Sequence, residues 1–511
     1  MPLLSLLLAA CAVPSDSSDS AAGCRPAELT WPDPITTLTA TLVAGDRLAE
    51  PTELNPALPE GLAAAEAMGL GTWTAGPGEA RIVRDDLAPG HVPGVDRRSL
   101  AFFLHESDAQ IADTESPTRL VLADAPGATQ SAARPQEVYA LHALDALVRT
   151  TNAFHAQTPL DFALITGDNA DSSQANELGW FRDTLDGTEV RPDSGETNSQ
   201  LDDDCNDPIA TFVPQGLDMP WYAVAGNHDV LVQGNFDPAA YVDSVLGSSA
   251  QAGTRDLSLP GGPVTTVTPA DAGRAVLERS DIAAMYLDSP STPGPVGHGF
   301  TDDDVANDAI TWSALPMPGI RLLALDANPP NSGDARLSAA ERDTFLIPAL
   351  NAAQAAHELV ILTSHYAMGN LEMEGGGVLS ELLATYPNVV LTVAGHSHVN
   401  DVAAFGAPDD PGAFWEVRTS STVDWPSQGR LVELVDNGDG TLSIFGTIFD
   451  ALAPEGSMSA RARTLTLIDW QSGWRWESGP GELEDRNVEL IQRLPEGWTF
   501  PGGEVRSLSL P

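Results

Sequence analysis

The segment 388-NVVLTVAGHSHVND-401 carries a short apolar run into a small-residue turn that presents two histidines, His396 and His398. Apolar runs of this length are typical of strands that are buried on both faces of a sheet. Gly395 lets the chain turn sharply off the strand and leaves the backbone close to whatever binds there. Because two imidazoles one residue apart on a tight turn cannot aim at one point without strain, the pattern favours two neighbouring metal ions.

Similar apolar runs recur from about residue 98 onward and alternate with helical patterns. The runs are 100-LAFFL-104, 161-DFALIT-166, 221-WYAVA-225, 320-IRLLALD-326 and 358-ELVILT-363. Residues 136–153 place apolar side chains on one helical face, and a capping box formed by Ser338 and Glu341 predicts the start of a helix that runs through Leu350. Residues 430–449 read as a β-hairpin. This alternation predicts an α/β fold with helices outside a mixed sheet.

Polar side chains follow these strands directly. They are Asp108, Gln110, Asp168, Asp171, Asn227, His228, Asp229, His365, His396 and His398. Most of them offer oxygen or imidazole ligands. The carboxyl ends of the strands in an α/β sheet share one crevice, so we expect these distant residues to converge there. Gly167 and Gly226 precede two of the groups and have the same expected role as Gly395.

The ordered blocks Gly-Asp-x-x-Asp (167–171), Gly-Asn-His-Asp (226–229), the lone His365 and Gly-His-x-His (395–398) resemble the calcineurin-like metallophosphoesterase superfamily. The resemblance spans about residues 100 to 400 and extends weakly to about 450. It implies a four-layer αββα sandwich with mixed sheets and long loop insertions. It also implies hydrolysis of phosphomonoesters or phosphodiesters by water that two divalent ions activate, with Mn, Fe, Zn or Mg as candidates.

The resemblance also implies a role for each residue. One metal would lie on Asp108, Asp168 and His398, with Gln110 at the position where the family usually has histidine. The second would lie on Asp168, Asn227, His365 and His396, so that Asp168 bridges the two ions. His228 would protonate the leaving oxygen or steady the transition state, and Asp229 would fix the tautomer of His228.

Several positions leave alternatives open. The amide oxygen of Gln110 is a harder and weaker ligand than imidazole, so the first site is expected to bind loosely or to favour Mn or Mg, unless Asp113 supplies the missing ligand. Asp171 either caps a helix or supports Asp168 from behind. His298 lies in a long polar stretch, where a structural role is favoured over contact with a substrate phosphate. Trp425 and Pro426 either line the crevice or shape a loop.

Charge restricts the partners of this 511-residue chain. It has 25 basic and 72 acidic residues, a formal net charge of −47, and no lysine. A strongly acidic surface repels polynucleotides and anionic lipids, so a small phosphate ester is expected rather than a nucleic acid polymer. Any membrane contact is expected through a lipid anchor only, and the oligomeric state is left open.

The N-terminus predicts export. The apolar run from Leu3 to Ala10 is too short to span a bilayer but suits a secretory signal, and Leu8-Ala9-Ala10-Cys11 resembles a bacterial lipoprotein cleavage box with Cys11 as the lipidation site. No basic residue precedes the run, which leaves a misplaced start codon or an ordinary apolar N-terminus as the alternative. The protein is thus expected in the cell envelope, lipid-anchored or secreted. Cys24 and Cys205 then form either a disulfide or two free thiols.

The predicted organisation has four parts. These are a signal and flexible tether (1–23), a Pro/Gly-rich β-like segment (24–97), the main domain (98–455, with insertions at about 183–210 and 232–300) and a C-terminal extension packing on it (456–511). The leading functional prediction is an exported metal-dependent phosphoesterase. The alternative is a surface lipoprotein that binds metal or a phosphorylated ligand without turnover, and Gln110 is the feature that favours it.

Overall fold

The computed structural model describes residues 29–94, 96–195, 207–257, 262–329, 334–475, 478–495 and 497–498. The predicted signal and tether, the lipidation site Cys11 and the two remaining cysteines, Cys24 and Cys205, lie outside these residues. Two large mixed sheets and two small hairpins make up the β-structure of the described part of the chain.

The larger sheet has seven strands. In spatial order they are β3 (Ile82–Arg84), β17 (Val488–Arg493), β16 (Thr441–Asp450), β15 (Gln428–Asp436), β4 (Arg98–Glu106), β5 (Phe162–Ile165) and β6 (Trp221–Ala223). β4, β5 and β6 are parallel, and β15 pairs antiparallel with both β4 and β16. The predicted hairpin at 430–449 is therefore confirmed, as β15 and β16.

The second sheet has six strands. In spatial order they are β13 (Asp401–Phe405), β14 (Phe414–Arg418), β12 (Val389–Ala394), β11 (Leu359–Thr363), β10 (Ile320–Ala324) and β9 (Trp312–Met317). β10, β11, β12 and β14 are parallel, and an antiparallel strand closes each edge. All six residues of β12 are buried, including Thr392, as its largely apolar sequence predicted.

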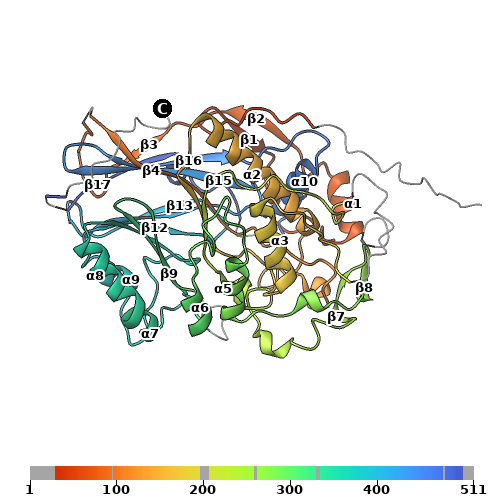
Figure 1. The fold of residues 1–511 in the computed structure, drawn as a ribbon. Helices are drawn as coiled ribbons and strands as arrows, with labels where there is room; N and C mark the ends of the chain where they lie inside the picture. Colours follow the sequence, from red (N-terminus) through yellow and green to blue (C-terminus); the bar gives the residue numbers. More distant parts are fainter. Residues whose placement is uncertain are drawn as a thin grey trace, which may run out of the picture.

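The two sheets lie face to face (Figure 1). Trp415 of β14 donates its indole N–H to the carbonyl of Ile491 in β17, at 3.4 Å, and Trp312 of β9 donates to the carbonyl of Ala223 in β6, at 2.7 Å. The main hydrophobic core joins side chains from both sheets, including Phe102, Ile361 and Leu431. Burial of this core holds the sheets in one fixed relation, so their strand ends come together.

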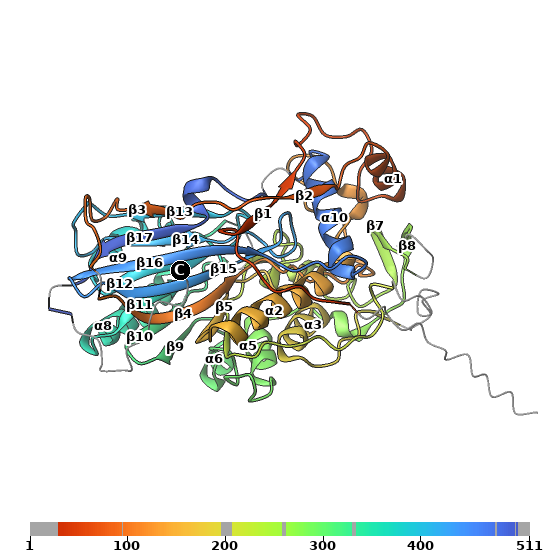
Figure 2. The ribbon, with the colours of Figure 1, turned by 90° about the horizontal axis from the view of Figure 1, so that it is seen from above.

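Helices cover the outer faces of both sheets. On the six-stranded sheet, helices α8 (Ile347–Ala355) and α9 (Leu379–Leu383) bury apolar side chains in a second core. On the seven-stranded sheet, α2 (Ala140–Gln157) places Phe154 5.1 Å from Phe449 of β16, between ring centroids. Figure 2 shows α2 and α3 (Ala175–Asp186) beside β4 and β5. The predicted α/β class with mixed sheets is thus confirmed.

The helix predicted from residue 338 is present as α7 (Ala339–Glu341), a π-helical segment (Arg342–Leu346) and α8. Ser338 caps it by accepting a hydrogen bond from the Glu341 N–H at 3.0 Å. The other half of the predicted capping box differs, because the Glu341 carboxylate accepts from the Asp326 N–H at 2.8 Å. Glu341 therefore ties the helix start to the loop after β10.

The segments at the two ends of the described chain meet. β1 (Ala40–Ala44) and β2 (Trp73–Pro77) form a hairpin, and α1 (Pro59–Ala67) lies between them in sequence. The β-like reading missed α1, which starts at a proline and continues through alanines that favour helix. β3 pairs in parallel with β17, so both end segments contribute strands to the seven-stranded sheet. The domain boundaries stay a prediction.

The described part of the second insertion also holds regular structure. It contains the hairpin of β7 (Ser249–Arg255) and β8 (Val264–Val267) and the helix α5 (Arg279–Leu287), with α6 (Asp302–Asn307) following. The C-terminal helix α10 (Met458–Gln471) packs against α2. Among the described residues, no helix has the length and apolar character needed to cross a bilayer.

Candidate metal centre

The site lies where the carboxyl ends of parallel strands from both sheets meet. Asp108 follows β4, Asp168 follows β5 and Asn227 follows β6, all in the seven-stranded sheet. His365 follows β11 and His396 follows β12 in the six-stranded sheet. The facing of the two sheets brings together residues that are nearly 300 positions apart, such as Asp108 and His396.

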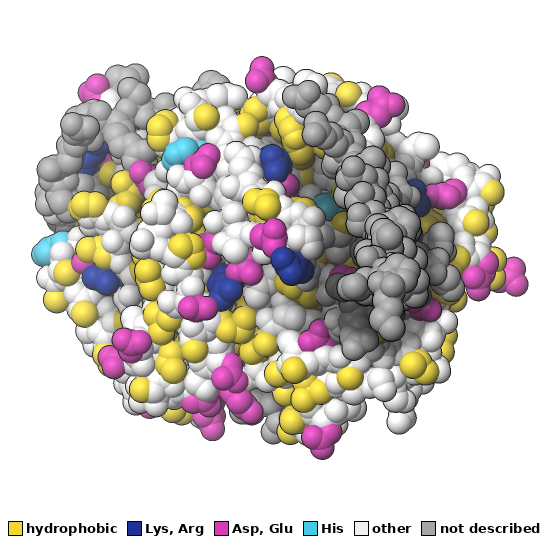
Figure 3. All heavy atoms as spheres, turned by 45° about the vertical axis from the view of Figure 1, so that its right-hand side comes forward, with side chains coloured by type: hydrophobic (Ala, Val, Ile, Leu, Met, Phe, Trp, Pro, Cys, Tyr) yellow, Lys and Arg dark blue, Asp and Glu magenta, His cyan; other side chains and the backbone are white. Residues whose placement is uncertain are grey.

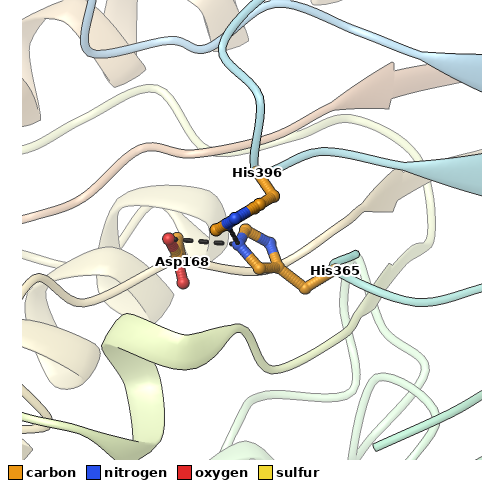
Figure 4. A group of neighbouring side chains, drawn as sticks. All are labelled: Asp168, His365 and His396. Carbon is orange, nitrogen blue, oxygen red and sulfur yellow. Dashed lines mark hydrogen bonds and ion pairs between the residues drawn. The ribbon is translucent and has the colours of Figure 1, made fainter. Parts of the chain in front are cut away.

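Three ligand-type side chains form the densest group at this place. One ligand atom from each of Asp168, His365 and His396 lies within 4.8 Å of the others (Figure 4). The Nε2 atom of His365 is 3.1 Å from Asp168 Oδ2 and 3.2 Å from His396 Nδ1. The Nδ1–H of His365 donates to the Thr166 carbonyl at 2.8 Å, which leaves the lone pair of Nε2 free for a metal ion.

Asp108 and His398 form the adjoining group. Asp108 Oδ1 lies 3.2 Å from His398 Nε2 and 3.9 Å from His365 Nε2, so this carboxylate stands between the two groups. Its other oxygen accepts a hydrogen bond from the His396 backbone N–H at 3.0 Å. Asp168 likewise uses one oxygen for the His228 backbone N–H, at 2.8 Å. Both carboxylates are thereby fixed with the second oxygen directed into the site.

Three buried oxygens at the site lack a hydrogen-bond partner within the described residues: Asp108 Oδ1, Gln110 Oε1 and Asn227 Oδ1. A buried acceptor without a donor is costly, so native structures satisfy such atoms with water or with an ion. The amide nitrogens are engaged, since Gln110 Nε2 donates to Asp168 Oδ2 at 3.2 Å and Asn227 Nδ2 donates to the Gly234 carbonyl at 3.1 Å. The residues therefore fit divalent cations, and Gln110 Oε1 is one of the acceptors that such a cation would satisfy.

The backbone of the site is strained. Asp108, Gln110, Asp168, His396 and His398 all have positive φ, between 42° and 67°. Residues other than glycine rarely adopt this region, and each costs free energy that the surrounding fold must supply. In the His-x-His turn both histidines adopt this left-handed conformation, and their rings face separate neighbours, His365 for His396 and Asp108 for His398.

Close approach explains two of the glycines. A Cβ atom on Gly226 would lie 2.1 Å from Asp168 Oδ1, and one on Gly395 would lie 1.8 Å from the Ser107 hydroxyl and 2.6 Å from Asp108 Oδ2. No side chain fits at either position without moving a ligand carboxylate. These glycines are required by space rather than by their backbone dihedral angles.

His228 is held by Asp171, which corrects the role predicted for Asp229. The Nδ1–H of His228 donates to the Asp171 carbonyl at 2.8 Å, and the Asp171 carboxylate is 3.5 Å away. Asp229 instead accepts hydrogen bonds from the backbone N–H groups of Gly226 and Ala170, at 2.7 and 2.8 Å. Its carboxylate shapes the loops that carry the ligands, because adjacency in sequence does not bring it to the His228 ring.

Asp171 also differs from both roles predicted for it. Helix α3 begins after Gln174, so Asp171 does not cap it, and its carboxylate faces His228 and two arginines rather than Asp168. It pairs with Arg119, and Arg134 Nη1 lies 3.4 Å from its Oδ1. All three of these charged side chains are buried.

His398 has an anchor that the sequence analysis missed. Its Nδ1–H donates to Asp424 Oδ2 at 2.6 Å, and the same carboxylate pairs with Arg475. A carboxylate behind a ligating histidine fixes the ring orientation and raises its basicity as a ligand. Asp424 lies in the segment SSTVDWPSQG, whose weak family similarity was the one available signal, directly before the Trp425-Pro426 pair.

The charges of the site shift the pKa values of its acids. Burial opposes ionisation of Asp168, but His365 and His228 outweigh it and hold the pKa of Asp168 well below its ordinary value. The pKa of Asp108 is lowered in the same way, by His398 and His365 against burial. Both carboxyl groups are therefore ionised at neutral pH.

The pKa values of the histidines shift in different directions. Burial lowers the pKa of His365, but Asp168 and Asp108 outweigh it and raise the pKa to about 9. The same balance raises the pKa of His398 and of His228. His396 keeps exposed surface, yet partial desolvation next to His365 lowers its pKa to about 4. A cation at this centre would thus displace protons from His365 and His398.

A cavity of about 390 Å³ opens onto these side chains. Its lining includes Asp168, Asn227, His228, His396 and His398. Gln110 also lines it. Two arginines, Arg134 and Arg475, complete the side of the cavity next to His228 and His398. The volume suits a small ligand.

Three residues with open roles lie elsewhere. Asp113 pairs with Arg274, at 2.8 Å, and so does not replace Gln110 at the site. His298 is buried with its ring stacked on Trp221, 3.3 Å between centroids, which agrees with the structural role that the sequence favoured. Trp425 is buried, and neither it nor Pro426 lines the cavity, so the pair shapes the loop that carries Asp424.

Comparison with known proteins gives one match by sequence. The sequence model of the calcineurin-like phosphoesterase family matches residues 109–400, which is more than half of the 511 residues. The match begins one residue after Asp108 and includes His398, whereas Asp424 and Arg475 lie beyond it. No relative among curated proteins matches the chain.

Solved structures give weaker likenesses. A dimetal phosphatase from Danio rerio is 12% identical, with a TM-score of 0.37, and the alignment covers 69% of this chain and 99% of that one. A purple acid phosphatase from yellow lupin (Lupinus luteus) seeds is 11% identical, with a TM-score of 0.32 and coverage of 73% and 55%. A structure of PhoD is 9% identical, with a TM-score of 0.30 and coverage of 78% and 80%. The family assignment rests on the sequence match alone.

Proposed function

We propose that this chain, which belongs to the calcineurin-like phosphoesterase family and is a metal-dependent phosphoester hydrolase, is an exported enzyme that cleaves small phosphate esters. The family implies two divalent ions and does not specify their identity. What supports the binuclear site in this chain is the set of buried oxygens on Asp108, Gln110 and Asn227 that lack hydrogen-bond partners among the described residues, next to Asp168, His365 and His396.

The side chains divide into two groups of donors. Asp108, Gln110 and His398 would hold one ion, while Asn227, His365 and His396 would hold the other, and Asp168 would serve both. Bound there, divalent cations supply Lewis acidity that activates water and stabilises charge on the phosphoryl oxygens. A shared carboxylate offsets the repulsion between two dications, and the neutral donors leave enough positive charge to attract phosphate.

His228 has the geometry of a general acid. Its Nδ1–H is bonded to the Asp171 carbonyl, so Nε2 is the atom available to the substrate, and the residue lines the cavity. As the oxygen of water bonds to phosphorus and the ester P–O bond breaks, Nε2–H gives its proton to the leaving oxygen. The raised pKa of His228, caused by Asp168 and Asp171 against the effect of burial, keeps that proton available near neutral pH.

A small ester suits both the cavity and the surface. On the face drawn in Figure 3, acidic side chains are scattered across the surface. With a net charge of −47, the chain would repel a polyanion at long range. Export is proposed from the N-terminal sequence alone, since Cys11 lies outside the described residues.

Hydrolysis assays test the proposal directly. Protein stripped of metal and reloaded with Mn²⁺ should hydrolyse p-nitrophenyl phosphate or bis(p-nitrophenyl) phosphate, and a chelator should abolish the activity. The His228→Ala variant should retain its metal but lose about 10²- to 10⁴-fold in kcat. Equal ligand binding by both proteins, with no turnover under any divalent ion, would favour the non-catalytic lipoprotein instead.

A further inference from the structure

Two buried arginines line the cavity beyond the metal ligands. The side chains of Arg134 and Arg475 are 1% and 7% exposed, and both border the same cavity as Asp168 and His228. Arg134 lies in the loop before α2, and Arg475 lies four residues after the end of α10, outside the family match. The cavity is therefore completed by a segment that the family pattern does not include.

The two guanidinium groups share one carboxylate. Arg475 pairs with Asp424 Oδ2, and Arg134 Nε lies 3.6 Å from Asp424 Oδ1. The nearest other carboxylate to Arg475 is Asp469, at 3.9 Å, where burial raises the pKa and disfavours the anion. The Nε–H groups of Arg134 and Arg475 have no hydrogen-bond partner within the described residues. These two Nε atoms are buried and lie 3.6 Å from Asp424 and 3.9 Å from Asp469, so a ligand in the cavity would meet the terminal Nη groups of each arginine.

The position of Arg475 separates it from the metal ligands. His398 directs Nε2 to Asp108, 3.2 Å away, whereas Arg475 Nη2 lies 3.4 Å from Nδ1, on the opposite side of the ring. A phosphoryl group held at the metal ligands would therefore be separated from Arg475 by the imidazole. An anion that contacts this guanidinium is therefore not the phosphoryl group at the metal ligands.

Arg119 shows what a purely structural arginine looks like in this network. It pairs with Glu137 and Asp171, is fully buried and does not line the cavity. Arg134 lies next to the same two carboxylates, whereas Arg475 pairs with Asp424. Of the three arginines, only Arg134 and Arg475 line the cavity. Among the lining residues, Asp168 and Asp334 are the carboxylates, and Arg134 and Arg475 are the arginines.

We propose that Arg134 and Arg475 bind a second anionic group of the substrate, a carboxylate or a second phosphate, so that small phosphate esters carrying another anion near the scissile group are preferred. This inference rests on the proposed phosphoesterase activity. Guanidinium groups suit both ligands because their planar N–H pairs match two oxygens of a carboxylate or a phosphate.

Matched substrates test the preference. With Mn²⁺-loaded protein, kcat/KM for 3-phosphoglycerate is compared with that for glycerol 3-phosphate, which has a hydroxymethyl group in place of the carboxylate. Fructose 1,6-bisphosphate is compared with fructose 6-phosphate to separate a second phosphate from a carboxylate. At least one ratio should be about 10- to 100-fold in favour of the anion, the range of a charge-assisted contact.

Variants assign the preference to the arginines. Arg475→Gln should bring the ratio close to one, and Arg475→Lys should leave an intermediate ratio, because lysine keeps the charge but not the planar donors. If Arg475→Gln does not fold, Arg134→Gln tests the same dependence of the kcat/KM ratio on an arginine. The exposed Arg336, paired with Glu372, gives the matched control Arg336→Gln, whose ratio should equal that of the wild type. A ratio of substrates cancels any general loss of activity.

The outcomes distinguish the two claims. Ratios near one in the wild type, or ratios that survive both glutamine variants, overturn the inference and leave the phosphoesterase activity standing. If no ester is hydrolysed, the activity fails, and calorimetric Kd values for the same ligand pairs decide the inference. The inference is supported if the ligand with the additional anionic group binds more tightly and Arg475→Gln removes that advantage. Equal Kd values for the two ligands of a pair overturn it.

Discussion

The two halves of the metal centre hold their buried histidines by different means. His365, on the Asn227 side, donates its Nδ1–H to the backbone carbonyl of Thr166, within the same turn that carries Asp168. His398, on the Gln110 side, donates to the carboxylate of Asp424, which is itself held by Arg475. One anchor is neutral and belongs to the strand end, while the other is charged and is built from residues beyond position 400.

The backbone of the fold supplies the anchor of His365, whereas side chains of this particular chain supply the anchor of His398. A backbone carbonyl is present whatever the side chain, so the His365 anchor persists as long as the strand end is intact. The His398 anchor depends on side chains in two later segments, and substitution can alter it. We therefore expect the Gln110 side to be the adjustable half of the centre. Substitutions of Asp424 and Gln110 test that expectation, Asp168→Asn removes the group common to both halves, and Asp171→Asn acts on the neighbouring His228.

Asp168→Asn should have the largest effect, because this carboxylate belongs to both halves and its loss removes the contrast between them. The expected fall in kcat/KM exceeds about 100-fold, the upper end for losing a group that only supports a ligand. Metal content by mass spectrometry should fall for both ions. Asp439→Asn, in the turn between β15 and β16, is the matched control. Retention of both ions would contradict the bridging role.

Asp424→Asn should weaken metal binding on the Gln110 side of the centre and leave the Asn227 side unchanged. Removing the charge behind His398 is expected to reduce affinity for one ion by about 10- to 100-fold while the other ion stays bound. Metal titration followed by calorimetry should then resolve one tight and one weak site. Equal weakening of both sites would show that the halves are not independent.

Asp171→Asn should alter pH dependence more than metal content. Asp168 and Asp171 raise the pKa of His228 against the effect of burial, so His228 keeps its proton to higher pH than an ordinary histidine. Removing the Asp171 charge lowers that pKa, and the proton is lost at lower pH. The alkaline limb of the kcat profile should therefore move to lower pH, with kcat near neutrality falling about tenfold. An unchanged limb with reduced metal content would assign Asp171 to the metal side instead.

Gln110→His should have the smallest effect, and it should raise metal affinity rather than lower it. Imidazole is a stronger ligand than an amide oxygen for Zn, so affinity at the adjustable half should rise by up to about tenfold. Competition with a chelator of known affinity measures the change. Unchanged affinity would mean that the Gln110 oxygen does not reach the ion.

Much of the fold was predictable because buried parallel strands leave unbroken apolar runs. The runs at β4, β5, β11 and β12 marked the strands, and the polar groups after them marked the strand ends that converge. The helix α1 was missed since the surrounding Pro/Gly-rich composition masked its short alanine run. The cap at Ser338 was predicted correctly, but the partner of Glu341 was not, because that contact comes from the loop after β10.

The sequence by itself determined which residue types stand at the strand ends, and hence the candidate ligands from Asp108 to His398. It could not determine which groups support them. Asp424 and Arg475 reach the site from segments that carry no ligand spacing, and Asp229 lies next to His228 in sequence yet bonds to backbone N–H groups instead. Periodicity and local motifs record contacts along a strand or turn, whereas the pairing of buried charges depends on how two sheets and the chain ends pack in space.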